Sequence, residues 1–295
     1  LLVYAPALER GYTPGSTVDD SPMSSSDPHK VRNSGNSYRG SISLRAAVMK
    51  SSNVATMRLY ESLTPKTALS YLEKMHFSHL VERDYKYYTT CLGGMTYGVT
   101  TEEMAAGFAT LANDGEYRAP TCIEEITDSS GALIVKGSTG TKKIYSKSAA
   151  NMMTDVLESV VTGGTGKGTK INGFDTAGKT GTTSDYRDGW FCGYTPYYTT
   201  AIWVGRDDHK IMYNLHGNTY PAYIWKDFMD DIHKNLDSTE NFKNYDGGES
   251  SIPASTQKTE ASTAKSSDTT AASTEATTTE AATTEASTTE APTTA

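Results

Sequence analysis

The sequence predicts an α+β fold in which helices pack on an antiparallel β-sheet. Segments with helical periodicity dominate the chain up to about residue 161, and aromatic and β-branched segments follow up to residue 205. The run Thr195-Pro-Tyr-Tyr198 is typical of a turn between two of these later segments, and it predicts an antiparallel hairpin. Helices that cluster before the strands of an antiparallel sheet are characteristic of α+β domains.

Seven segments carry apolar residues at helical spacing. They cover residues 1–9, 43–50, 54–62, 66–75, 101–113, 146–161 and 222–235. Thr64-Pro65 supplies an N-cap and a first-turn proline for the fourth segment. Either Thr100 or Thr101 caps the fifth, and Ser146 caps the sixth. The apolar residues of the last segment are Ile224, Phe228 and Ile232.

Strand signals occur in two places. Residues 122–127 and 132–136 flank Asp128-Ser-Ser-Gly131 and predict a hairpin. Further along, Lys179 is placed on or at the start of a strand, and residues 188–196 and 199–205 follow as the two arms of the second hairpin. The sheet is therefore expected to contain the Lys179 strand and the hairpin after it.

The composition changes near Gly247. From there on the chain is almost entirely Ser, Thr, Ala and Glu, with Glu275, Glu280, Glu285 and Glu290 recurring every five residues. Such a segment buries too little apolar surface to offset its chain entropy. The sequence therefore predicts a folded domain over residues 1–240 and a disordered tail over residues 247–295.

Charge and cysteine content exclude several classes of function. From Asp246 onward, eight acidic residues and two lysines give −6 of the formal net charge of −8, so residues 1–245 carry only −2. A nearly neutral folded part predicts no nucleic-acid partner. Three widely spaced cysteines (Cys91, Cys122 and Cys192) and six scattered histidines form no ligand motif, so we expect no metal and no cofactor. No run is long enough to span a bilayer.

The first candidate site is the stretch Asp175-Thr-Ala-Gly-Lys-Thr-Gly-Thr-Thr183. Its single cation, Lys179, is flanked by threonine hydroxyls, and this combination suits a carboxylate ligand. Gly173-Phe-Asp-Thr-Ala-Gly-Lys-Thr180 also matches the phosphate-loop pattern at every fixed position. That motif needs a strand before it and a helix from its lysine. A glycine-rich loop and a hairpin stand there instead, which disfavours the nucleotide-binding alternative.

The second candidate site is Ser51-Ser-Asn53, which separates two predicted helices. An isolated Ser-x-Asn is most often an N-cap, here for the helix that begins near Val54. Its position upstream of Lys179-Thr-Gly181 makes the pair more informative than either part. Serine β-lactamases and penicillin-binding proteins combine Ser-x-x-Lys, Ser-x-Asn and Lys-Thr-Gly in that order.

The chain resembles the transpeptidase domain of class A penicillin-binding proteins over nearly all of residues 1–235. The residues that carry the resemblance are Tyr4-Ala-Pro-Ala-Leu-Glu9, Asp19-Asp20, Leu44-Arg45, Ser51-Ser-Asn-Val54, Gly98-Val-Thr100, Glu103-Met-Ala105, Ala112-Asn-Asp-Gly115, Gly178-Lys-Thr-Gly-Thr-Thr183, Asp188-Gly-Trp-Phe191, Gly193-Tyr-Thr-Pro196 and Trp203-Val-Gly205. The resemblance implies a penicillin-recognising α+β fold and a peptidoglycan D,D-transpeptidase that acts outside the cytoplasm. It also implies stem peptides and β-lactams as ligands, a membrane anchor upstream of Leu1, and neighbours in the cell-wall synthesis machinery.

The resemblance also assigns roles to residues of this chain. Ser51 would relay a proton toward the leaving amine, and Asn53 would hydrogen-bond the substrate amide. Lys179 would attract the terminal carboxylate, with the hydroxyls of Thr180 and Thr182 fixing its orientation. Gly181 would keep the strand edge unobstructed, and the backbone N–H at Thr182 would contribute to the oxyanion hole.

One part of the family pattern does not occur at its expected place. Ser-x-x-Lys precedes the Tyr-Ala-Pro-Ala-Leu-Glu segment in this family, but here it matches only Ser255-Thr-Gln-Lys258 and Ser262-Thr-Ala-Lys265 in the predicted tail. We therefore expect the nucleophile upstream of Leu1, and expect residues 1–295 alone to be inactive. A binding module for stem peptide or wall polymer is the alternative function. A carboxypeptidase stays open, and a β-lactamase is disfavoured because no Glu-x-x-Leu-Asn-like segment is present.

Overall fold

The computed structural model describes residues 1–137 and 140–243. The predicted tail, residues 247–295, lies outside the described residues. Within the described ranges, no helix is both long enough and apolar enough to cross a membrane.

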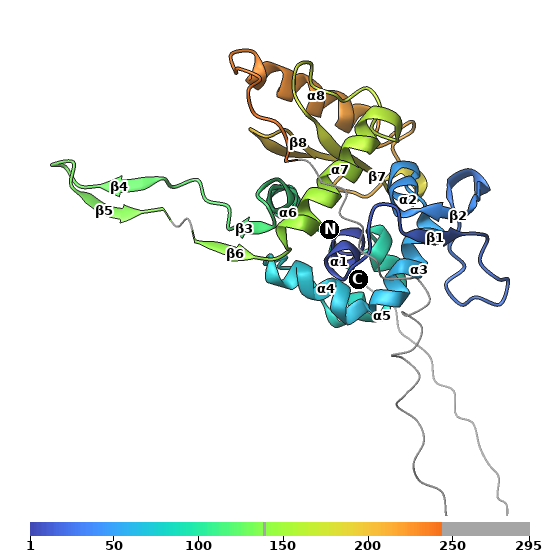
Figure 1. Cartoon of the computed structure of the whole chain (residues 1–295). Helices are drawn as coiled ribbons and strands as arrows, with labels where there is room; N and C mark the ends of the chain where they lie inside the picture. Colours follow the sequence, from blue (N-terminus) through green and yellow to red (C-terminus); the bar gives the residue numbers. More distant parts are fainter. Residues whose placement is uncertain (138–139, 244–295) are drawn as a thin grey trace, which may run out of the picture. The chain divides into compact units, whose positions relative to one another are not determined.

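The described part alternates short helices with antiparallel strand pairs (Figure 1). The helices are α1 (Tyr4–Glu9), α2 (Leu44–Lys50), α3 (Asn53–Leu63), α4 (Pro65–Lys74), α5 (Glu82–Lys86), α6 (Thr101–Ala112), α7 (Lys147–Gly163) and α8 (Tyr220–His233), with 3-10 turns η1 (Ser34–Asn36), η2 (Tyr88–Leu92) and η3 (Ser184–Tyr186). The strands are β1 (Thr17–Asp20), β2 (Gly40–Ser43), β3 (Glu116–Arg118), β4 (Glu125–Thr127), β5 (Leu133–Lys136), β6 (Thr141–Lys143), β7 (Ala177–Thr182), β8 (Asp188–Tyr194) and β9 (Thr199–Gly205). This composition confirms the predicted α+β class.

Hydroxyl side chains start most of the longer helices. Ser43, Ser52, Thr64, Thr100 and Ser146 each accept a hydrogen bond from a backbone N–H in the first turn of the helix that follows. These bonds satisfy donors that have no partner inside the helix. The predicted caps at positions 64 and 146 are confirmed, and Thr100 rather than the residue after it caps α6. The first helix begins at Tyr4, three residues later than the sequence predicts.

The main sheet has three antiparallel strands in the order β7-β8-β9, so β7 is an edge strand. Helices α6 and α7 pack on one face of this sheet, and α8 packs on the other. Residues of β8 alternate between the two faces, as a strand requires. Cys192 and Tyr194 belong to the core shared with α6 and α7, whereas Phe191 packs under α8 against Trp225. The predicted sheet around Lys179 is confirmed.

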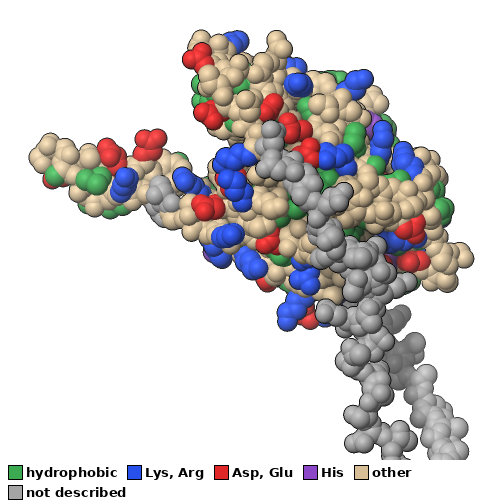
Figure 2. Space-filling model, in the orientation of Figure 1, with side chains coloured by type: hydrophobic (Ala, Val, Ile, Leu, Met, Phe, Trp, Pro, Cys, Tyr) green, Lys and Arg blue, Asp and Glu red, His purple; other side chains and the backbone are tan. Residues whose placement is uncertain are grey.

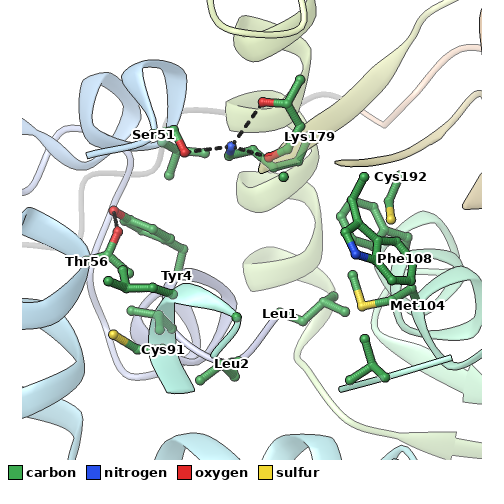
Figure 3. Close-up of a pocket in the computed structure, with 18 of the residues that line it drawn as sticks. Leu1, Leu2, Tyr4, Ser51, Thr56, Cys91, Met104, Phe108, Lys179 and Cys192 are labelled. Carbon is green, nitrogen blue, oxygen red and sulfur yellow. Dashed lines mark hydrogen bonds between the residues drawn. The ribbon is translucent and has the colours of Figure 1, made fainter. Parts of the chain in front are cut away.

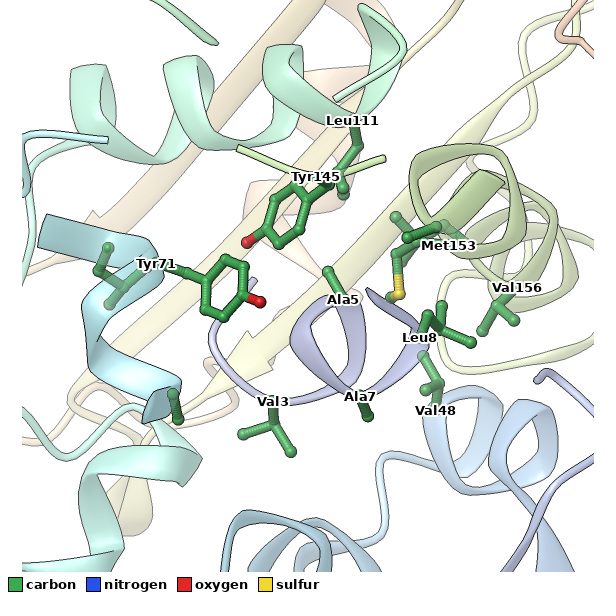
Figure 4. Packing of buried hydrophobic residues seen from close by; sticks show 14 of the residues in the cluster. Val3, Ala5, Ala7, Leu8, Val48, Tyr71, Leu111, Tyr145, Met153 and Val156 are labelled. Carbon is green, nitrogen blue, oxygen red and sulfur yellow. The ribbon is translucent and has the colours of Figure 1, made fainter. Parts of the chain in front are cut away.

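The larger core surrounds α1, which is buried between α7 and the helices that follow α1 in the chain (Figure 4). Ala5, Ala7 and Leu8 point outward from this short helix into the core, and Leu8 lies close to Met153 of α7. Full burial of an aliphatic side chain of this size contributes about 1.5–3 kcal/mol. This core holds α2, α3 and α7 around one centre and so positions the residues at the end of α2.

Helix α8 turns a different face to the sheet from the one that its sequence suggested. Ile224 and Phe228 are 48% and 49% exposed, whereas Trp225 and Met229 are fully buried against the sheet. The Trp225 indole also donates to the backbone oxygen of Thr200 at 3.1 Å. The large indole decides the rotation of the helix, because it fills the space above β8 and β9.

The other strands form three two-stranded pairs, β1-β2, β3-β6 and β4-β5. The predicted hairpin near residue 130 is confirmed as β4-β5, and Figure 1 shows it projecting away from the helices. Basic and acidic side chains are interspersed over the face shown in Figure 2. This distribution is consistent with the nearly neutral charge of residues 1–245.

Candidate active site

Ser51 and Lys179 meet where α2 ends beside the edge strand β7. Ser51 is the C-cap of α2 and has left-handed backbone angles, φ 52° and ψ 48°. The Lys179 ammonium donates to Ser51 Oγ, with Nζ and Oγ 3.0 Å apart (Figure 3). The two candidate motifs of the sequence are therefore neighbours in space, although 128 residues separate them in the chain.

A cavity of about 340 Å³ opens beside this pair. The six site residues named from the sequence all line it, namely Ser51, Asn53, Lys179, Thr180, Gly181 and Thr182. Apolar side chains of α6, including Met104 and Phe108, line another part of its wall, together with Trp190 of β8. The cavity thus joins a polar rim, suited to a peptide end, to an apolar interior.

The Lys179 ammonium is held at the base of the polar rim. Besides Ser51, its Nζ donates to the backbone oxygen of Thr180 at 2.8 Å. Burial lowers the pKa of Lys179 from its ordinary 10.5 to about 8, because water no longer solvates the charge fully. Cys192 lies opposite Lys179 in the strand register, and burial raises the pKa of its thiol to about 12. At neutral pH the ammonium is therefore mostly charged and the thiol is neutral.

The threonines beside Lys179 have protein partners. The Thr180 hydroxyl donates to Thr165 Oγ1 at 2.7 Å, so in this arrangement its proton is directed toward the glycine-rich loop. Thr182 is exposed, and its Oγ1 accepts from the backbone N–H of Gly217 at 2.9 Å. An accepting hydroxyl keeps its own proton free, so Thr182 is better placed than Thr180 to donate to a carboxylate.

Gly181 and Gly217 are closely packed at the edge of the sheet. A Cβ added at Gly181 would lie 3.1 Å from the Cβ of Trp190 on β8. On the other side, a Cβ added at Gly217 would lie 2.5 Å from the backbone oxygen of Gly181. The loop before α8 therefore lies directly on this strand. Sequence reasoning missed Thr165 and Gly217, for which the glycine-rich run 162–168 and the spacing before α8 were only weak signals.

Asn53 is the first residue of α3 and lies on the same rim. Its side-chain nitrogen donates to the backbone oxygen of Arg32 at 2.9 Å. The capping alternative is confirmed for one residue of the stretch, because Ser52 is the N-cap of α3 and its Oγ accepts from Ala55 N. Ser52 thus caps the helix, whereas Ser51 and Asn53 line the cavity.

The phosphate-loop alternative is wrong. Lys179 lies in the middle of β7, and the chain continues through Thr182 and η3 into β8 rather than into a helix. A phosphate site of that type needs the N–H groups of a helix N-terminus at the lysine.

The family model of the penicillin binding protein transpeptidase domain matches residues 1–230. The chain belongs to this family. A match over most of the chain confirms the resemblance seen in the motifs.

Relatives and solved structures agree with this penicillin-binding transpeptidase domain. Penicillin-binding protein 4 of Bacillus subtilis is 36% identical over 227 residues, which is 77% of this chain and 36% of the relative. Penicillin-binding protein 1A of Clostridium acetobutylicum is 34% identical over 248 residues, or 80% of this chain and 30% of the relative. The chain thus spans about a third of the length of these curated relatives.

Among solved structures, the penicillin-binding protein PonA1 of Mycobacterium tuberculosis superposes with a TM-score of 0.72 at 26% identity, covering 82% of this chain and 69% of that chain. The same values hold for PonA1 in complex with penicillin V. The antiparallel sheet flanked by helices is therefore the fold of this transpeptidase domain.

Proposed function

We propose that the protein carrying this domain cross-links peptidoglycan as a serine D,D-transpeptidase and binds β-lactams. The contact between Lys179 Nζ and Ser51 Oγ, at the mouth of a cavity in a penicillin-binding transpeptidase domain, carries the proposal. It unites a cation for the substrate carboxylate with a hydroxyl that can pass a proton. The PonA1 complex with penicillin V supports a β-lactam as ligand.

The proposed reaction is acyl transfer from the D-Ala-D-Ala end of a stem peptide. A serine Oγ attacks the carbonyl carbon of the penultimate D-Ala, the amide bond breaks, and the terminal D-Ala leaves after its nitrogen gains a proton. An amine of a neighbouring stem then attacks the ester, so that a new amide forms and the serine hydroxyl is restored. The attacking serine of a Ser-x-x-Lys motif is not placed among residues 1–243, so only the roles below concern this chain.

Lys179 would attract the terminal carboxylate of the substrate. A positive charge that is already held in place by Ser51 and the Thr180 carbonyl needs little reorganisation when a carboxylate arrives. The free proton of the Thr182 hydroxyl would bind one carboxylate oxygen, and this contact would fix the direction of the peptide.

Ser51 would move the proton. Its Oγ accepts from the Lys179 ammonium and can donate its own proton toward the leaving nitrogen. Asn53 would hold the amide of the peptide from the opposite side of the rim. These assignments, an extracytoplasmic location at the cell wall, and stem peptides as the natural ligand are parts of the same proposal.

A non-catalytic module that binds stem peptides is the second candidate. The contacts that hold Lys179 can serve to bind a carboxylate without any covalent step, whereas covalent catalysis also needs an activated nucleophile. The coding sequence upstream of Leu1 separates the two candidates. A Ser-x-x-Lys shortly before the Tyr4 segment supports the enzyme, and its absence supports the binding module.

The direct test is acylation by a fluorescent penicillin, measured by intact-protein mass spectrometry. We expect residues 1–295 alone to form no adduct, and a chain extended by an upstream Ser-x-x-Lys to gain one equivalent. In the extended chain, Lys179→Ala is expected to slow acylation by about 10²-fold or more, as loss of one preorganised electrostatic contact does. Lys50→Ala is the matched control, because it removes the same charge from an exposed position next to Ser51. Equal rates for Lys179→Ala and the control would contradict the proposal.

A further inference from the structure

A buried polar cluster lies directly beneath the Ser51–Asn53 turn. It consists of Asp20 at the end of β1, Asn33 in the following loop, and Ser52 in the turn itself, with 0%, 7% and 2% of their surfaces exposed. None of the three lines the cavity. Buried polar groups are costly unless they hydrogen-bond, so three of them together indicate a specific role.

The three side chains form a closed set of hydrogen bonds. Asp20 Oδ1 accepts from Asn33 Nδ2 at 2.6 Å and also from the Ser52 hydroxyl. Asn33 Oδ1 accepts from the backbone N–H of Val54 at 3.1 Å and lies 3.3 Å from Ser52 Oγ. Ser52 Oγ in turn accepts from Ala55 N at 3.0 Å. The carboxylate therefore orients the very hydroxyl that caps α3.

The carboxylate itself is incompletely compensated. Within residues 1–137 and 140–243, Asp20 Oδ2 accepts no hydrogen bond, and the nearest cation, Arg39 Nη1, lies 3.7 Å away. A buried carboxylate in which only one oxygen accepts hydrogen bonds reduces stability. The cluster is thus better explained by what it holds in place than by the stability it contributes.

The turn above the cluster needs such support. Ser51 has φ 52°, a left-handed conformation that is uncommon for residues other than glycine, asparagine and aspartate. The segment Arg32–Asn33 holds the turn on its other side, since Asn53 Nδ2 donates to the Arg32 oxygen at 2.9 Å. Ser51, held in this conformation, is the residue whose Oγ reaches Lys179 Nζ.

We infer that Asp20 is a positioning residue which, through Asn33 and Ser52, holds the Ser51–Asn53 turn in the conformation that brings Ser51 Oγ against Lys179. The placement of Ser51 by this cluster does not depend on any reaction. Its effect on acylation rests on the proposed function.

The placement is tested on residues 1–295 with the variants Asp20→Asn and Ser52→Ala. The readout is the titration of the Lys179 side chain by NMR in ¹³C-lysine-labelled protein, with the signal assigned by its loss in Lys179→Ala. When the turn is released, water reaches the ammonium, so the midpoint is expected to move upward from about 8 toward the ordinary 10.5. Ser52→Thr, which keeps the hydroxyl, is expected to restore the wild-type midpoint.

Thr64→Ala is the matched control, because it removes a helix cap of the same kind from α4. It is expected to lower the melting temperature without changing the Lys179 midpoint. Should Asp20→Asn fail to fold, Ser52→Ala decides alone. An unchanged Lys179 midpoint in folded Ser52→Ala overturns the inference, as does an equal change in Thr64→Ala.

The consequence for chemistry is tested on a chain extended by Ser-x-x-Lys. Penicillin acylation is expected to slow by about 10- to 100-fold in Ser52→Ala and to stay at the wild-type rate in Thr64→Ala, because small displacements of a reacting group cost rate steeply. Rates equal to wild type in Ser52→Ala overturn a catalytic consequence of the cluster. If the unmutated extended chain is not acylated, the proposed function fails, and the Lys179 titration still decides the placement.

Discussion

The guanidinium of Arg45 in α2 binds both the backbone oxygen and the side-chain carboxylate of Asp155 in α7. Its Nη1 donates to the Asp155 backbone oxygen at 3.1 Å and to Ser159 Oγ at 2.7 Å, and its Nη2 pairs with the Asp155 carboxylate. Ser51 is the C-cap of helix α2, and α7 packs against β7, which carries Lys179. This contact therefore joins the two elements that hold the halves of the candidate site.

Arg45→Lys is expected to lower the free energy of unfolding by about 1 kcal/mol, because an ammonium cannot reproduce the planar fork of the guanidinium. The estimate is modest, since the side chains of Arg45 and Asp155 are 31% and 35% exposed. Denaturant unfolding of residues 1–295 measures it. Arg206→Lys, in the exposed pair with Asp208, is the control and should leave stability essentially unchanged, because solvent screens this pair. An equal loss of unfolding free energy in both variants would show that the Arg45 contact does not join α2 to α7 more firmly than an exposed ion pair would.

Binding of a peptide carboxylate is expected to weaken as the pH rises through about 8. Lys179 is charged below its pKa of about 8 and neutral above it, so its attraction for a carboxylate is present at neutral pH and is lost at higher pH. NMR titration of residues 1–295 with a D-Ala-D-Ala-terminated peptide at several pH values provides the measurement. Lys179→Ala should bind weakly at every pH. A wild-type affinity that is constant between pH 7 and 10 would show that Lys179 is not the carboxylate partner.

Gly217→Ala is expected to destabilise the fold by about 1–3 kcal/mol and to disturb the end of β7. The added methyl would lie 2.5 Å from the Gly181 oxygen and 2.7 Å from the Trp190 oxygen, and backbone atoms cannot move away as a flexible side chain can. Denaturant unfolding and the amide shifts of Gly181 and Thr182 report the effect. Gly140→Ala is the control, because nothing lies within 4 Å of the added carbon there. A neutral Gly217→Ala would mean that the loop before α8 is free to move off the strand.

Stability is expected to decrease as the pH rises from about 4.5 to about 7, in part because of Glu158. Burial, together with the negative charges of Asp175 and Asp155, raises the pKa of Glu158 from 4.5 to about 7. Between these two values the folded state holds a proton that the unfolded state releases. The contribution of Glu158 to the free energy of unfolding is therefore full below pH 4.5 and is lost as the pH rises through 7. Melting temperatures measured across this range should vary less in Glu158→Gln than in wild type. Glu102→Gln, at an exposed position, is the control and should follow the wild-type profile.

We propose that the segment after residue 246 adds nothing to the stability of the domain, because its composition offers almost no apolar surface to bury. A chain ending at Asp246 should melt within about 1 °C of the chain ending at Ala295, whereas a loss of about 1 kcal/mol would shift the midpoint by about 2–4 °C. A drop of that size would show that the segment packs on the domain.

Much of this architecture follows from local signals in the sequence. Thr64-Pro65 starts α4, Ser146 starts α7, and the aromatic and β-branched runs form β8 and β9, because caps, prolines and period-two patterns act within a few residues of themselves. The order of Ser51-Ser-Asn53 and Lys179-Thr-Gly181 along the chain likewise indicates the family without any information on the contact between them.

Only the tertiary structure decided how these pieces act on one another. The 3.0 Å contact between Ser51 and Lys179, the depressed pKa of Lys179 and the burial of Trp225 in place of Ile224 all depend on residues far apart in the chain. The same holds for Asp20, which belongs to the family pattern in the sequence, although only the structure shows it fully buried against Ser52. The solvation of a side chain and its long-range hydrogen bonds depend on which surfaces come into contact when the helices pack. A local sequence pattern does not determine these contacts.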